Sequence, residues 1–350
     1  MKPCGTDQDL HGVKFALSPT NQGSSCGTDQ DLLAQSNCGG VKFALSPTNQ
    51  GSLAASNGPV AIIGVGNMGG AMARRLLELG WTVQVCDIDC AKTKNLESFG
   101  AVVLDTPAQA AINSVVLMVV VVDAMQTEDV LFGPHGLAHT LEPGRTVMLC
   151  PTLAPDDVVR FAQRLDEMGV QVLDAPMSGG PKRAGEGSMS LMLAGSAAVL
   201  AQHSALLEAL ASQRFVISTR VGDAARTKLV NNLAAGINLV AAAEVLALAQ
   251  KMGLDLTRTL DVMAQSSGQS WIGSDRMRRA IAGDFAPRAH MTLLQKDTRL
   301  ALEAAQALGF AGPLGAAARD VFAAASANGL ADEDDAALFK WLSASPSSPN

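Results

Sequence analysis

The stretch VAIIGVGNMG, residues 60–69, decides the fold class of this chain. A short run of apolar, β-prone residues passes directly into the pattern G-x-G-x-x-G, and a helical pattern follows from Ala71 to Leu79. In such a unit the first glycine makes a tight turn, the second leaves room for a pyrophosphate, and the third lets helix and strand pack closely. Backbone N–H groups at the start of the helix favour an anion. We therefore expect the loop to bind a dinucleotide through Gly64, Val65, Gly66, Asn67, Met68 and Gly69.

The residue that follows the second apolar run indicates which dinucleotide binds. The run Thr82–Cys86 is followed by Asp87, which stands about twenty residues after the glycine loop. A carboxylate there can accept a hydrogen bond from the adenosine ribose 2′-OH and would repel a 2′-phosphate. The pattern predicts NAD, with NADP as the alternative, and Asp89 is a second candidate for the ribose contact. The structural alternative is a glycine turn between an ordinary strand and helix.

Composition excludes several classes of protein. The chain has 350 residues, enough for about two domains, and 48% of them are hydrophobic, which excludes wholesale disorder. The net charge is −7 and no run is rich in Lys or Arg, so we expect neither a nucleic-acid nor an anionic-membrane partner. The longest apolar run, Val115–Val122, is too short to span a membrane, and the N-terminus lacks the apolar core of a signal peptide. We therefore expect a cytoplasmic protein.

The cysteines and histidines do not form a metal-binding pattern. The six cysteines include no C-x-x-C, and the five histidines form no cluster with ligand spacing. In a reducing compartment the cysteines would be free thiols. We expect no metal site.

Residues 1–57 contain an imperfect duplication. The segment Cys4–Leu10 recurs as Cys26–Leu32, and Gly12–Ser24 recurs as Gly40–Ser52. Two copies of a Gly-, Ser- and Asn-rich unit are too few for a repeat architecture. We interpret 1–57 as a mostly disordered extension without a catalytic role, and an interaction tail is the alternative.

From Pro59 onward, short apolar runs alternate with helical patterns. Expected strands lie near 60–63, 82–86, 101–104, 115–122, 146–149, 171–173, 190–193 and 215–217, with helices such as 155–168 and 197–210 between them. This alternation is typical of a doubly wound, mostly parallel sheet, the Rossmann architecture.

The alternation stops near Gly222, and an Ala- and Leu-rich helical region follows. The stretch Asp223–Met252 predicts one helix of about 45 Å, stopped by Gly253. We expect a Rossmann domain over 58–220, an all-α domain over 221–342 joined by this long helix, and a frayed tail over 343–350.

A second glycine-rich segment, DAPMSGG at residues 174–180, follows the predicted strand 171–173. It would lie at the carboxyl edge of the sheet, where open α/β sheets bind ligands. The hydroxyl of Ser178 and the backbone N–H groups of Gly179 and Gly180 suit a carboxylate. A purely structural turn is the alternative.

Lys228 and Asn232 are four residues apart, so they share one face of the long helix. An ammonium and an amide together can act on an alcohol or carbonyl oxygen. The alternative for Lys228 is an ordinary solvated surface lysine.

Four segments in this order resemble the motifs of the β-hydroxyacid dehydrogenase family, also called the 3-hydroxyisobutyrate dehydrogenase family. They are the cofactor motif at 64–73, the substrate motif at 174–187, the catalytic motif at 222–232 and the pair Lys296-Asp297. The resemblance covers about residues 59–342. It departs from the family pattern at Ala224, at Pro181-Lys182-Arg183 and at Pro151.

The resemblance implies a role for each of these segments. Lys228 would be the catalytic acid/base, and the substrate would bind at Ser178, Gly179, Gly180 and Asn232. Thr152 and Lys296 would contact the cofactor. The family also implies a homodimer or homotetramer.

The substrate implied by the resemblance is a short hydroxycarboxylic acid. Ser270-Trp271, the stretch from Gly283 to Arg288 and the ending near Glu333 resemble the subgroup of L-threonate dehydrogenases and 2-hydroxy-3-oxopropionate reductases. Trp271 and Arg288 either reach the site or serve packing and surface pairing. Two alternatives remain, an imine reductase on the same scaffold and a non-enzymatic NAD-binding protein, and the presence of Lys228 disfavours both.

Overall fold

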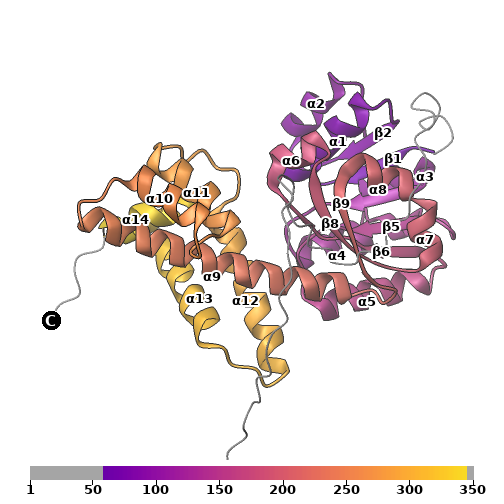
Figure 1. Ribbon diagram of the computed structural model, residues 1–350. Helices are drawn as coiled ribbons and strands as arrows, with labels where there is room; N and C mark the ends of the chain where they lie inside the picture. The colour runs from indigo at the N-terminus through magenta and orange to yellow at the C-terminus, as the bar shows by residue number, and fades with distance from the viewer. Residues whose placement is uncertain (1–57, 345–350) are drawn as a thin grey trace, which may run out of the picture. The chain divides into compact units, whose positions relative to one another are not determined.

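The computed structural model describes residues 58–344 (Figure 1). The expected extension 1–57 and most of the expected C-terminal tail lie outside these residues.

The N-terminal half of the described chain forms a nine-stranded sheet in the order β3-β2-β1-β4-β5-β6-β8-β7, with β9 paired to β8. The strands are β1 (Val60–Ile63), β2 (Val83–Cys86), β3 (Val102–Val103), β4 (Val116–Val119), β5 (Thr146–Leu149), β6 (Gln171–Asp174), β7 (Met177–Ser178), β8 (Met189–Ala194) and β9 (Ala211–Ser218). The first six pair in parallel, whereas β8 runs antiparallel to β6 and β7. The expected doubly wound, mostly parallel sheet is confirmed.

Helices cover both faces of this sheet because the central strands are apolar on both faces. In β1, Val60 and Ile62 pack into one core cluster, and Ala61 and Ile63 into another, as the two-residue period of a strand requires. The first cluster includes residues of α1 (Asn67–Glu78), α2 (Cys90–Glu97), α6 (Gly180–Glu186), α7 (Ala197–Gln202) and α8 (Ser204–Leu210). The second includes residues of α3 (Pro107–Asn113), α4 (Ala124–Phe132), η1 (Leu137–His139) and α5 (Pro155–Asp166).

The strand order reverses between β1 and β4, since β2 lies on one side of β1 and β4 on the other. A crevice at the carboxyl ends of the strands at such a point is the usual ligand site of this architecture. The glycine loop leaves β1 at this position, so the fold places it at this crevice.

The C-terminal half is helical and is organised around α9 (Asp223–Lys251). Its remaining elements are α10 (Leu256–Gln265), α11 (Trp271–Ile281), α12 (Met291–Ala307), α13 (Pro313–Ala325), η2 (Ser326–Leu330), η3 (Asp335–Ala337) and α14 (Leu338–Ala344). Near its start, α9 packs Ala225 against the sheet core, and further on it packs Leu239 and Leu246 into the helical core. It ends at Lys251, and Gly253, two residues further on, has a φ of +74°, the conformation that suits a glycine after a helix end.

Several local features differ from the sequence expectation. The short strand β7 and the helix α6 were not expected, and β9 begins four residues before the strand expected over 215–217. The helix expected over 197–210 is two helices that meet at His203. The ring of His203 is buried and lies 2.8 Å from the Thr146 hydroxyl through Nε2. Its φ of −106° and ψ of 16° interrupt the helix, so a tertiary contact coincides with the break.

Among the described helices, α9 alone is long and apolar enough, by length and composition, to cross a membrane. The length of uninterrupted apolar runs did not reveal this segment. In the structure 44% of the most apolar 18-residue stretch of α9 is buried inside the protein. The core helix of a soluble protein can have the same length and apolar composition.

Candidate functional site

The glycine loop makes close backbone contacts at two of its glycines and leaves open space at the third. Gly64 has a φ of +92°, and a Cβ added there would lie 2.6 Å from the carbonyl oxygen of Val120. A Cβ at Gly69 would lie 2.0 Å from the carbonyl oxygen of Gly64. At Gly66 a Cβ would meet no atom within 4 Å. Gly64 and Gly69 are therefore required by the backbone itself, whereas Gly66 leaves open space where a ligand can approach.

Asp87 lies directly against this loop. Its Oδ2 accepts a hydrogen bond of 2.7 Å from the backbone N–H of Val65, and its Oδ1 accepts one of 2.9 Å from the N–H of Asp89. The side chain of Asp89 instead caps α2 through the N–H of Ala91 and pairs with Lys92. Of the two candidate carboxylates, Asp87 is the one that the fold joins to the loop.

The segment Met177–Gly180 forms a sharp turn between β7 and α6. Gly179 and Gly180 both have positive φ, 129° and 73°, which the sequence had indicated by its paired glycines. The Nζ of Lys228 donates a hydrogen bond of 2.6 Å to the backbone carbonyl of Met177. Two motifs that are about fifty residues apart in sequence are thus adjacent in space.

Lys228 is buried, with only 7% of its surface exposed, so it is not a solvated surface lysine. Burial, reinforced by the nearby charge of Lys296, lowers the pKa of Lys228 to about 8, and the carboxylate of Asp297 opposes this shift. The fold therefore gives this ammonium group a pKa at which it can both accept and donate a proton near neutrality.

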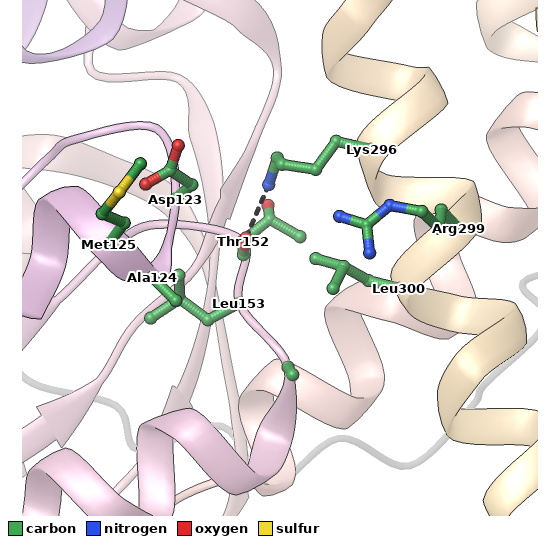
Figure 2. A pocket seen from close by; sticks show the side chains of 9 residues that line it. Asp123, Ala124, Met125, Thr152, Leu153, Lys296, Arg299 and Leu300 are labelled. Carbon is green, nitrogen blue, oxygen red and sulfur yellow. Dashed lines mark hydrogen bonds between the residues drawn. The ribbon is translucent and has the colours of Figure 1, made fainter. Parts of the chain in front are cut away.

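A chain of polar contacts continues from α9 to the end of β5. Asn232 Nδ2 donates a hydrogen bond of 2.6 Å to Asp297 Oδ2, and Lys296 Nζ lies 2.9 Å from Asp297 Oδ1. Lys296 Nζ also donates a hydrogen bond of 2.6 Å to the backbone carbonyl of Thr152 (Figure 2). Both Asn232 and Asp297 are buried. The structure thus brings together Lys228, Asn232, Lys296 and Thr152, which the sequence had only placed in separate motifs.

A pocket of about 260 Å³ adjoins this chain of contacts (Figure 2). It lies after β4 and β5 and against α12, and its lining includes Asp123, Thr152, Lys296 and Arg299. Neither Asp123 nor Arg299 stands in a recognisable motif of the sequence, so their positions in this pocket were not predicted. Arg299 pairs with Glu303 one helical turn away at 2.7 Å, an exposed contact.

Asp174 is a further residue whose role the sequence did not reveal. It ends β6, is almost fully buried, and its Oδ2 accepts hydrogen bonds from the backbone N–H groups of Gly222 (2.8 Å) and Ala225 (3.1 Å). Burial raises its pKa to about 6 despite these bonds. Asp174 therefore caps the N-terminus of α9, the helix that carries Lys228.

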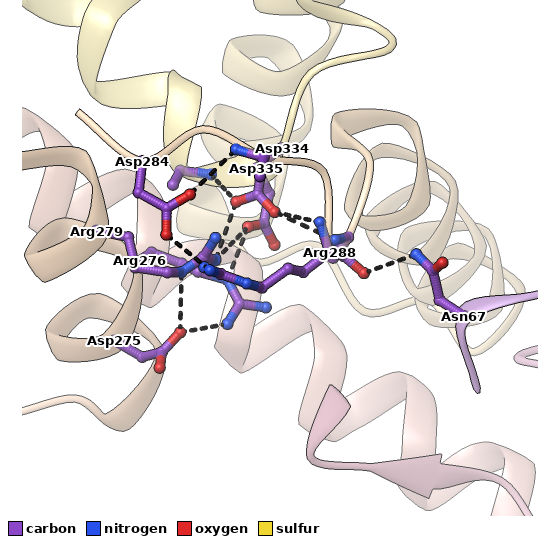
Figure 3. Close-up of polar contacts among 11 residues, drawn as sticks. Asn67, Asp275, Arg276, Arg279, Asp284, Arg288, Asp334 and Asp335 are labelled. Atoms are coloured by element: carbon purple, nitrogen blue, oxygen red, sulfur yellow. Dashed lines mark hydrogen bonds and ion pairs between the residues drawn. The ribbon is translucent and has the colours of Figure 1, made fainter. Parts of the chain in front are cut away.

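Trp271 and Arg288 occupy positions outside this cluster. The guanidinium of Arg288 pairs with Asp284 at 2.7 Å, both side chains being partly exposed, and its backbone N–H donates to the buried Asp334 (Figure 3). Its carbonyl accepts a hydrogen bond of 3.4 Å from Asn67 of the glycine loop. Trp271 is half exposed at the start of α11 and lines a separate pocket of about 460 Å³. Surface pairing is thus the observed contact of the Arg288 side chain.

The buried thiols and the acidic residues give no metal centre. Within residues 58–344, no group of three or more His, Cys, Asp or Glu side chains is arranged to hold a metal ion. Burial raises the pKa of Cys86 to about 11 and raises that of Cys150 further, so both thiols remain protonated in the core.

Comparisons with known proteins agree with this geometry. Residues 59–221 match the family described as the NAD-binding domain of 6-phosphogluconate dehydrogenase. Residues 222–342 match the family described as NAD-binding of NADP-dependent 3-hydroxyisobutyrate dehydrogenase.

The matches to individual relatives cover almost the whole length of each relative. An L-threonate dehydrogenase of Cupriavidus necator is 35% identical over 80% of this chain and 95% of its own. A 2-hydroxy-3-oxopropionate reductase of Escherichia coli is 33% identical over 81% of this chain and 96% of its own. A solved 3-hydroxyisobutyrate dehydrogenase of Salmonella typhimurium is 35% identical, with a TM-score of 0.76 over 81% of this chain and 99% of its own.

The sheet, the glycine loop and the helical region define an NAD(P)-binding dehydrogenase of the Rossmann type. The chain belongs to the 3-hydroxyisobutyrate dehydrogenase family. It is a hydroxyacid dehydrogenase that acts on a CH–OH group.

Proposed function

We propose that this enzyme transfers a hydride between NAD and a short hydroxycarboxylate of the L-threonate type, with Lys228 as the acid/base. The observation that carries the proposal is the buried contact of 2.6 Å between Lys228 Nζ and the carbonyl of Met177, next to the Ser178–Gly180 turn. It brings a group for proton transfer to a turn suited to a carboxylate.

The residues present fit the cofactor. Gly66 leaves open space at the start of α1, and the helix N-terminus there has no side-chain cap, so its N–H groups are available to a pyrophosphate. When bound, the nicotinamide supplies the hydride acceptor. The residues that would hold the dinucleotide are Gly64, Val65, Gly66, Asn67, Met68, Gly69, Asp87, Thr152 and Lys296.

The protein side of the reaction needs one proton transfer and firm positioning. Ser178 and the N–H groups of Gly179 and Gly180 would hold the substrate carboxylate. Neutral Lys228 would take the proton of the reacting hydroxyl during oxidation, and the ammonium form would return it during reduction. Asn232 has one N–H hydrogen beyond the one given to Asp297, and we propose that this hydrogen contacts the substrate oxygen.

Asp87 supports NAD over NADP. Its carboxylate is already fixed against the loop by the N–H of Val65, so it cannot easily turn away from an incoming 2′-phosphate. A 2′-phosphate beside Asp87 would be repelled by the like charge of its carboxylate.

The relatives support the choice of substrate class. L-Threonate dehydrogenases at 34–35% identity and the reductase at 33% all carry names of short hydroxylated carboxylates or their oxo forms. We infer L-threonate as the first substrate to test and 2-hydroxy-3-oxopropionate as the second.

Two further expectations concern the state of the protein in the cell. We infer a homodimer or homotetramer in the cytoplasm. Large apolar side chains exposed on the helical region, among them Val230, Leu248 and Val262, support association with a second copy.

The test is a substrate panel read by NADH absorbance, with L-threonate, 2-hydroxy-3-oxopropionate and 3-hydroxyisobutyrate, run with NAD and with NADP. Lys228→Ala should lower kcat by about 10²–10⁴ while NADH still binds, because only the proton transfer is lost. Lys251→Ala is the matched control, since Lys251 is exposed in the last turn of the same helix. Near-normal turnover of Lys228→Ala would refute the mechanism.

A further inference from the structure

The buried carboxylate of Asp297 connects the two halves of the candidate site. It lies on α12 with 6% of its surface exposed. Its Oδ2 accepts from Asn232 on the candidate substrate side, and its Oδ1 pairs with Lys296 on the candidate cofactor side. We propose that Asp297 is a positioning residue that couples dinucleotide binding at Lys296 to hydroxycarboxylate binding at Asn232. This inference rests on the function proposed above.

The packing of α12 on α9 is what allows this connection. A Cβ at Gly236, one turn after Asn232, would lie only 2.6 Å from the Cγ2 of Thr298, the residue after Asp297. The glycine therefore lets the two helices approach closely at this point. The approach brings the short side chain of Asp297 within hydrogen-bond distance of Asn232.

Asp297 fixes the orientation of the Asn232 amide. An ionised carboxylate only accepts hydrogen bonds, so the NH₂ group of Asn232 must face it. Asn231 supports the same orientation, because its Nδ2 donates a hydrogen bond of 3.1 Å to Asn232 Oδ1. The second N–H hydrogen of Asn232 is then the part of the amide that remains for a substrate oxygen.

Asp297 also carries the negative charge between two lysines. Its carboxylate pairs with Lys296. The carboxylate raises the pKa of Lys228, and the charge of Lys296 lowers the same pKa. The Lys296–Asp297 pair and the Asn232–Asp297 hydrogen bond share one carboxylate. A dinucleotide that contacts Lys296 favours the same arrangement of this carboxylate that a substrate at Asn232 requires, so the affinity for the substrate rises. By linkage, the substrate must raise the affinity for the dinucleotide by the same factor.

The coupling can be measured without turnover, because NADH and L-threonate are both reduced and form a dead-end complex. NADH is titrated by its fluorescence with and without saturating L-threonate. In the unmodified enzyme L-threonate should lower the Kd of NADH by about fivefold or more. In Asp297→Asn this ratio should fall to about one. Asp320→Asn makes the same change at an exposed residue of α13 and should keep the original ratio.

A second readout does not involve either ligand. The rate at which Lys228 reacts with an acylating reagent, followed against pH by mass spectrometry, reports its pKa. Asp297→Asn should lower this pKa relative to the unmodified enzyme, since the charge that raises it is gone. If Asp297→Asn does not fold, Lys296→Met removes the other arm of the connection, and its NADH titration should likewise lose the dependence on L-threonate.

The outcomes separate this inference from the proposed function. An unchanged ratio in Asp297→Asn, or a ratio of one in an enzyme that oxidises L-threonate, would overturn the coupling and leave the function intact. Full turnover of Lys228→Ala would overturn the mechanism whatever the ratio. An unaltered Lys228 pKa in Asp297→Asn would also count against the role of Asp297.

Discussion

At Lys228 the chemistry depends on the surroundings of the side chain. A lysine in water has a pKa of about 10.4 and is a poor base near neutrality. Burial of the Lys228 side chain, whose Nζ contacts the Met177 carbonyl, lowers its pKa to about 8. The carboxylate of Asp297 prevents a larger fall. The pKa of Lys228 is thus set by its burial beside the Met177 carbonyl and by two charged residues of α12.

The pKa of Lys228 predicts the pH profile. Oxidation requires the neutral amine, so kcat/KM for the hydroxyacid should rise about tenfold per pH unit below pH 8 and level off above it. Reduction requires the ammonium form, so its rate should be constant at low pH and should fall as the pH rises above the same midpoint. Steady-state rates between pH 6 and 10 in both directions would check this. An oxidation rate that still rises about tenfold per pH unit up to pH 10, as for a lysine with the ordinary pKa of about 10.4, would contradict the assignment of Lys228.

Residue identity predicted part of the candidate site. Lys228, Asn232 and the Ser178–Gly180 turn were proposed from their motifs and spacing. The helix-capping role of Asp174, the first residue of that glycine-rich segment, and the position of Arg299 were not predicted, because a carboxylate that caps a helix about fifty residues away, or an arginine that lines a pocket, has no local signature. Their positions follow from tertiary packing.

At the scale of elements, the glycine loop shows why three glycines are needed for two different reasons. Gly64 and Gly69 permit the close contact between the turn, β4 and α1, whereas Gly66 keeps open space for the ligand. Glycine thus serves packing at two positions of the loop, and at the third it leaves room for the proposed ligand.

Two alanine variants should separate these reasons. Gly69→Ala would place a methyl group against the Gly64 carbonyl and should destabilise the protein by about 1–3 kcal/mol. Gly66→Ala meets no protein atom and should unfold at the original temperature, yet bind NADH roughly tenfold or more weakly. Thermal unfolding and NADH titration on both variants would check this. Equal losses of stability would contradict the distinction.

The element boundaries were predictable where the chain is locally consistent. β1 and β5 have the expected limits, and α9 differs from its expected end by one residue. The break at His203 and the strand β7 were not predictable, because they depend on contacts with β5 and β8.

At the scale of the whole molecule, every residue assigned to the candidate site lies between Gly64 and Arg299. The two family matches begin at residue 59 and end at residue 342. The duplicated segment 1–57 lies outside both the matches and the site.

Removal of residues 1–57 should therefore leave kcat/KM within about twofold of the full chain, well below one kcal/mol in the barrier. Removal of residues 1–63 is the control. It also deletes β1, which pairs with both β2 and β4 in the centre of the sheet, and should abolish folding. Circular dichroism and the NADH assay would compare the two. A large loss of activity on removal of 1–57 alone would show that the extension acts on the enzyme.

The sequence by itself determined the doubly wound, mostly parallel architecture, the glycine loop, the long helix and the family. These follow from local patterns, the periods of strand and helix and the need for glycine at tight turns. Tertiary structure alone decided that Lys228 is buried beside the Met177 carbonyl, that Asp174 caps α9, and that Asp297 joins Asn232 to Lys296. The physical reason is that desolvation and charge pairing depend on which distant segments are in contact, and these contacts form only in the folded chain.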